Sequence, residues 1–84
     1  MKYTSVGARA EAIDVTTVSW AMPTGSVAAP IGIYCNAATT ITGALVNDTT
    51  ETSWVLAAGV MHPLSFRSIN TSSTTKNGYK VIYP

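Results

Sequence analysis

Three features are scarce in this sequence: charge, cysteine and histidine. Of its 84 residues only 11% are charged, and the chain holds one cysteine, Cys35, and one histidine, His62. A single cysteine excludes a disulfide within the chain, and one Cys with one His cannot supply a four-ligand zinc site. Small domains usually add a disulfide, a metal or oligomerisation to a small core. Oligomerisation is the device that remains.

The few charges are widely spread along the chain. No Asp, Glu, Lys or Arg occurs from Val15 to Asn47 or from Thr52 to Phe66, and the net charge is +1. Nucleic-acid binding requires clustered Lys and Arg, so we expect no nucleic-acid partner. No secretion signal is visible and no apolar run is long enough to span a membrane. A monomer with so few charged residues is poorly protected against association, and we infer that neighbouring subunits cover much of its surface. The alternative is a surface that stays soluble through its hydroxyl groups.

The composition predicts a β fold. Thr and Val supply 21 residues against three Leu, and turn signals recur about every eight to twelve residues, as in small sandwiches and barrels. We predict an N-terminal arm over 1–12, extended or disordered, and one all-β domain over 13–84, a small antiparallel β-sandwich or barrel. The six predicted strands are 13–20, 31–35, 39–46, 51–57, 60–69 and 79–83. The third and fourth form a hairpin.

Some positions have specific roles in this prediction. The strand 31–35 is apolar on both faces and is expected to be central, with Gly32 marking a bulge or a close backbone approach. Pro63 cannot donate a ladder hydrogen bond, so it belongs at a strand start or on an edge. Asn77–Gly78 has the composition of a type I′ turn.

No catalytic motif is present. His62 is the only imidazole, and neither a GxSxG elbow nor a family-type cysteine context occurs. Asp48 and Glu51 lie three residues apart, where a solvated turn is favoured over a glycosidase pair. Cys35 lies in the most apolar strand, which favours a buried structural thiol. We therefore expect no enzyme activity, no cofactor, no metal and no small-molecule substrate.

The aromatic residues and His62 allow two interpretations each. Trp20, Trp54, Phe66 and the four tyrosines could form a carbohydrate platform, but a core or subunit interface is favoured because aromatics dominate both. His62 could be a pH switch, although a lone histidine at a strand start is more often a rim residue. The candidate residues for a subunit or shell interface are Tyr3, Arg9, Trp20, Met22, Met61, His62, Arg67 and Tyr83.

Three segments between Ile31 and Pro84 carry a resemblance: "IGIYCNAATTITGALVND", "VLAAGVMHPLSFRSINTSSTT" and "KVIYP". Together they look like the small head-spike base and capsid-decoration proteins of tailed phages and gene transfer agents. The matching positions are Gly32, Ile33, Tyr34, Ile41, Leu45, Gly59, Pro63, Leu64, Arg67, Thr74, Thr75, Val81, Ile82 and Tyr83. His62 and Phe66 stand where that family has an aliphatic residue, and Lys76–Asn77–Gly78 replaces a small-residue turn.

The resemblance implies a β-sandwich that works as a multimeric virion component without catalysis. We therefore expect a cyclic homo-oligomer that binds other virion proteins such as the major capsid protein. It would be made in the cytoplasm of a bacterial host and lie on the capsid exterior or at a vertex. A tail-spike or fibre base, or a receptor- or carbohydrate-binding β-module, is the alternative.

Overall fold

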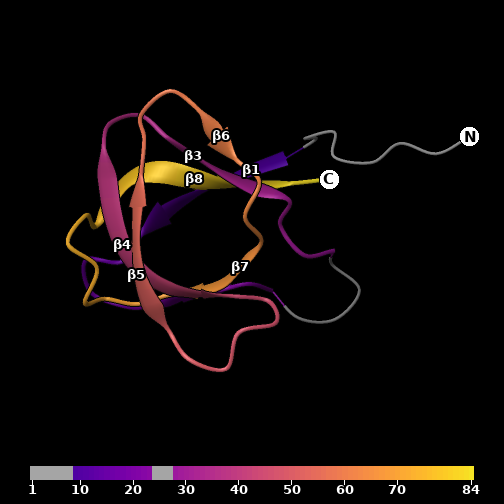
Figure 1. Cartoon of the computed structure of the whole chain (residues 1–84), viewed down its shortest axis with the longest axis horizontal. Coiled ribbons are helices and arrows are strands. Elements are labelled where there is room, and N and C mark those ends of the chain that lie inside the picture. The colour runs from indigo at the N-terminus through magenta and orange to yellow at the C-terminus, as the bar shows by residue number, and fades with distance from the viewer. Residues whose placement is uncertain (1–8, 24–27) are drawn as a thin grey trace, which may run out of the picture.

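The computed structural model describes residues 9–23 and 28–84, which form two antiparallel sheets of four strands each (Figure 1). Sheet A contains, in spatial order, β1 (Arg9–Asp14), β8 (Asn77–Tyr83), β3 (Gly32–Cys35) and β6 (Met61–His62). Sheet B contains β2 (Trp20–Ala21), β7 (Phe66–Ile69), β4 (Thr39–Leu45) and β5 (Thr52–Leu56). The predicted all-β fold is confirmed. The described residues contain no helix long and apolar enough to cross a membrane.

The chain alternates between the two sheets. Every connection crosses from one sheet to the other except the one between β4 and β5, which is the predicted hairpin. Consecutive strands therefore contribute to opposite layers, and the hydrophobic core forms where the layers meet.

Alternate residues of the strands fill the space between the sheets. The hydrophobic core cluster takes Ile13, Ile33, Cys35, Tyr79, Val81 and Tyr83 from sheet A, and Ile41, Leu56, Phe66 and Ile69 from sheet B. The prediction that strand 31–35 is central is confirmed, because β3 lies between β8 and β6. Full burial of a side chain such as Phe66 stabilises the fold by about 1.5–3 kcal/mol.

A bulge in β8 replaces the turn predicted at Asn77–Gly78. Ile13 pairs with Tyr79 but Asp14 pairs with Asn77, so Gly78 is the extra residue. Its φ of 88° lies in the left-handed region that glycine adopts without steric cost. The prediction of a type I′ turn is wrong, because the Asn-Gly pair bends a continuous strand instead of reversing the chain.

A second bulge, in β7, keeps two core residues on the same face. Leu45 pairs with Phe66 and Ala44 with Ser68, which leaves Arg67 as the extra residue. In a regular strand Phe66 and Ile69 would point to opposite faces, since they are three residues apart. The extra residue restores the phase, and both side chains are fully buried.

Two predicted strands are each divided, which gives eight strands instead of six. The segment 13–20 breaks after β1 because the Asp14 carboxylate accepts hydrogen bonds from the backbone N and Oγ1 of Thr16, at 3.0 and 2.6 Å. The segment 60–69 divides at Pro63 into β6 and β7, which belong to different sheets.

The predicted boundary between arm and domain also moves. Residues 9–12 are not part of an arm but belong to β1, where Arg9 pairs with Tyr83 and Ala12 with Lys80. Residues 1–8 of the predicted arm lie outside the described residues.

Candidate subunit interface

Two neighbouring rows on the outer face of sheet A contain a single charged residue. Residues directly opposite one another in neighbouring strands share a face, so the register defines two rows across the sheet. The first row is Ala12, Lys80, Tyr34 and Met61, and the second is Ala10, Ile82 and Gly32. We call these seven residues the A face. Lys80 is its only charged member. Asp14 follows Ala12 on the same face of β1 and pairs with Asn77 beyond the bulge, so one exposed carboxylate lies at the end of the A face.

Side chains lie flat along the A face. A Cβ atom placed on Gly32 would be 2.9 Å from Cε of Met61, which shows that the Met61 side chain extends over this glycine. The Lys80 Nζ lies 5.9 Å from the centroid of the Tyr34 ring, within the range of a cation–π contact. Ala10 and Ala12 are exposed, and Met61 is 41% exposed. The A face therefore combines three small residues with the larger side chains of Tyr34, Met61, Lys80 and Ile82.

The outer face of sheet B is richer in hydroxyl groups. Its rows contain Thr40, Thr42, Ser53 and Ser68 beside the apolar Ala21, Ala44 and Val55. The Glu51 carboxylate accepts hydrogen bonds from Oγ of Ser68 at 2.9 Å and Nδ2 of Asn70 at 2.8 Å. Hydroxyl groups are therefore concentrated on the outer face of sheet B, whereas coverage of the surface by neighbouring subunits stays a prediction.

Of the eight candidate interface residues, Met61 alone lies on the A face. Tyr83 is 2% exposed and belongs to the core, so it offers a partner almost no surface. Its hydroxyl donates a hydrogen bond to Oε1 of Glu11 at 2.7 Å, and the Arg9 guanidinium lies 4.0 Å from its ring centroid. Arg9 is exposed at the end of β1. Tyr3 lies outside the described residues.

His62 and Arg67 each bind the chain's own backbone. His62 Nε2 lies 3.1 Å from the carbonyl oxygen of Ala57. Arg67 donates to the carbonyl oxygen of Asp48 from Nη2 at 2.9 Å and from Nε at 3.3 Å, which ties β7 to the β4–β5 loop. The two residues belong to different sheets, so the structure does not bring them together.

Trp20 and Met22 lie next to β7. The Trp20 ring is half-buried against the core, and its indole nitrogen is buried without a hydrogen-bond partner in the part of the chain that the structure describes. The backbone N–H of Met22 donates to the carbonyl oxygen of Arg67 at 2.9 Å. Both side chains are half-buried.

Most of the A face was missed because its residues are not conspicuous in the sequence. Ala10 and Ala12 fall in the predicted N-terminal arm, and Gly32 is predicted as a bulge or a close backbone approach and as a position of the phage resemblance, not as part of a surface. Alternation in 79–83 did place Tyr79, Val81 and Tyr83 together, which leaves Lys80 and Ile82 on the other face. Their cross-strand neighbours depend on the pairing of β8 with β1 and β3, which no local pattern encodes.

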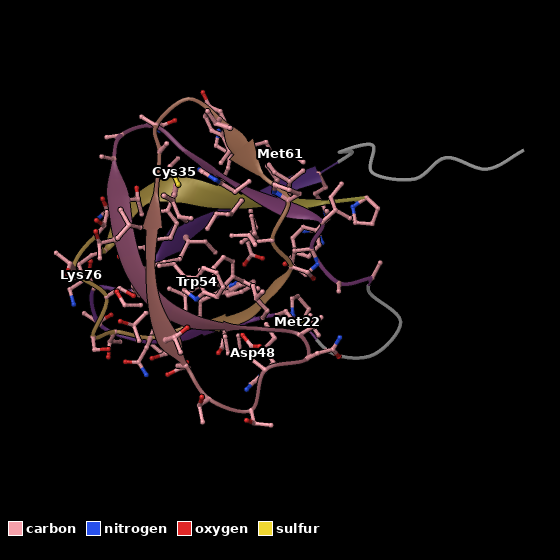
Figure 2. The ribbon with its side chains drawn as sticks, in the orientation of Figure 1. Met22, Cys35, Asp48, Trp54, Met61 and Lys76 are labelled. Atoms are coloured by element: carbon pink, nitrogen blue, oxygen red, sulfur yellow. The ribbon has the colours of Figure 1, made fainter. Side chains whose placement is uncertain are left out.

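Reactive groups are buried or dispersed. Figure 2 shows Cys35 and Trp54 in the space between the two sheets. Burial raises the pKa of the Cys35 thiol, although a hydrogen bond with Thr39 opposes the shift. Within residues 9–23 and 28–84 there is no group of three or more His, Cys, Asp or Glu that could hold a metal ion, and no pocket.

No protein family, curated protein or solved structure matches this chain. The resemblance to phage proteins therefore rests on the sequence motifs alone.

Proposed function

We propose that this protein is a non-catalytic structural subunit of a tailed-phage virion, a capsid decoration protein or a head-spike base, which binds the shell as an oligomer. The observation that carries the proposal is the A face, with one charge among its seven residues. An antiparallel sheet with one solvated face normally places polar residues on that face. The A face departs from this pattern, which supports a partner that covers it.

The residue types of the A face suit contact with a partner surface. Ala10, Ala12 and Gly32 bring the sheet backbone close to whatever covers it, while Tyr34 and Met61 supply larger apolar groups. Interface cores are depleted in charge and enriched in aromatic residues and methionine. Many identical copies in a shell would spread a small contact over the whole assembly, so each subunit needs little stability alone.

The packing of the tryptophans favours a structural subunit over a carbohydrate-binding module. The Trp54 indole nitrogen donates to the carbonyl oxygen of Gly43 at 3.1 Å, and its ring meets the Phe66 ring at 5.5 Å and 83°. Trp20 also packs against the core. A sugar platform needs an exposed ring face, whereas both rings are used for packing.

The test is the composition of purified virions together with one pair of variants. Ala10→Lys adds a charge at an exposed position of β1 on the A face, and lysine on an edge strand is well tolerated. Ser72→Lys adds the same charge in an exposed loop outside both faces and is the matched control. Both variants should fold, which circular dichroism checks.

We expect the chain in purified virions, and we expect the Ala10→Lys variant to be incorporated at least about tenfold less than Ser72→Lys, since burial of an unpaired charge costs more than about 1.4 kcal/mol. A stable monomer in native mass spectrometry, together with virions that lack the chain, would refute the proposal. Glycan binding that a single Trp→Ala substitution abolishes in a folded protein would support the carbohydrate-binding module instead.

A further inference from the structure

The two sheets end in four edge strands, and three of them are protected against pairing with another chain. The strand β1 carries Arg9, Glu11 and Asp14, and charge on an edge discourages association. The strands β2 and β6 have two residues each, and Pro63 follows β6. The fourth edge, β5, has five residues without charge or proline. Long uncharged edges of this kind are templates for strand addition.

The hydrogen-bond pattern of β4 shows which groups of β5 face outward. The carbonyl oxygen of Thr42 accepts from the backbone N–H of Asn70, and that of Thr40 accepts from Thr75, so both point away from β5. Ile41, between them, therefore bonds to its partner Trp54. It follows that the N–H and C=O groups of Ser53 and Val55 point away from β4, toward the open edge.

Nothing in the described part of the chain covers this edge. Ser53 is exposed and Val55 is 81% exposed, the highest value among the large hydrophobic residues of 9–23 and 28–84. No turn or loop backbone group and no side chain in the described residues donates to or accepts from the main chain of either residue. Two donors and two acceptors therefore form a regular row, spaced as in a strand that lacks its neighbour.

We propose that a second copy of this chain occupies the edge, with β5 antiparallel to the β5 of the first copy. Ser53 of each copy would pair with Val55 of the other, across a two-fold axis at Trp54. This register uses all four outward groups of each strand. It also keeps the Glu51 carboxylates at opposite ends of the paired strands, so no like charges meet.

The pairing would join the two B sheets into one continuous eight-stranded sheet. Because β5 and the A face belong to different sheets, each subunit could hold a partner copy through β5 and still present its A face to the shell. The β5–β5 contact would be one of the contacts between copies of this chain in the virion assembly that the proposed function requires. It is tested on the purified chain, so it stands or fails separately from the identity of the shell.

Two substitutions at Val55 separate backbone pairing from side-chain contact. Val55→Pro removes the outward N–H, and the pairing of β5 with β4 loses no hydrogen bond because that group points away from β4. Val55→Thr keeps the N–H and a β-branched side chain and is the control. We expect Val55→Pro to weaken dimerisation at least about tenfold in sedimentation equilibrium, and Val55→Thr to retain it.

Residue-resolved amide hydrogen exchange by NMR reads the register directly. The Ser53 and Val55 amides should become protected as the protein concentration rises, while the Trp54 amide stays protected throughout because it bonds to β4. A dimer whose Ser53 and Val55 amides exchange freely would overturn the inference. So would a chain that stays monomeric at every concentration, or a Val55→Thr variant that dissociates as fully as Val55→Pro.

Discussion

Single-residue deletions provide a demanding test of the β7 bulge. Arg67 is the extra residue between the pairs Leu45–Phe66 and Ala44–Ser68. Its removal should leave a regular strand in which Phe66 and Ile69 are two residues apart and still share the core face. The comparison is deletion of Lys80 from β8, which pairs without a bulge from Tyr79 to Tyr83.

The two deletions differ in what they cost. Deletion of Arg67 loses the hydrogen bonds of its guanidinium to Asp48, about 1.5–3 kcal/mol for a charged donor, and the bond from Met22, about 0.5–1.5 kcal/mol. Deletion of Lys80 shifts the strand by one residue and turns either Tyr79 or both Val81 and Tyr83 to the outside. Each displaced side chain costs about 1.5–3 kcal/mol before cavities are counted.

Urea denaturation followed by tryptophan fluorescence measures both variants. A domain of this length has a total stability of about 4–12 kcal/mol, so the Arg67 deletion should remain folded and the Lys80 deletion should be largely unfolded. Arg67→Ala, which keeps the bulge, should cost about 1.5–3 kcal/mol and isolates the contribution of the guanidinium. If deletion of Arg67 is as damaging as deletion of Lys80, the bulge is not a phase correction and the reasoning is wrong.

Two further predictions concern close packing and alkaline stability. Gly43→Ala should destabilise the fold by about 1–3 kcal/mol in chemical denaturation, because the new methyl group would lie 2.5 Å from the backbone oxygen of Ser68. Gly59→Ala meets no atom within 4 Å but has a φ of 73°, so it should cost about 1–2 kcal/mol. A larger loss of stability for Gly59→Ala than for Gly43→Ala would contradict the steric account. Burial raises the pKa of both Tyr79 and Tyr83 from 10 to about 12. Since the folded state holds these protons more tightly, stability should be intact below pH 10 and fall as the pH rises toward about 12. Tyr83→Phe should make this decline less steep in denaturation curves recorded across that range, and an unchanged slope would argue against the raised pKa.

Local pattern was enough to predict the elements whose partners are near in sequence. The segments 39–46 and 51–57 alternate clearly and are joined by a short polar turn, and the hairpin they form is observed. The apolar run at 31–35 predicted a central strand because a strand buried on both sides needs apolar residues on both faces. The close approach predicted at Gly32 is also observed, where an added Cβ would lie 2.9 Å from the backbone oxygen of His62.

Features set by distant partners could not be predicted. The sequence from Arg9 to Ala12 has no clean period, and it forms a strand because β8 offers it a free edge. The two-residue strands β2 and β6 are too short to produce any pattern of their own. The composition of the A face depends on which strands lie side by side, and residue spacing along the chain does not contain that information.

The central claim is that a partner covers the A face in the assembled particle. Hydroxyl-radical oxidation of Met61, read by mass spectrometry in the free chain and in purified virions, tests it most directly, with Met22 beside β7 of sheet B as the internal comparison. The account predicts that Met61 is readily oxidised in the free chain and strongly protected in the particle, while Met22 changes much less. Equal oxidation of Met61 in both states, or a particle without the chain, would contradict it.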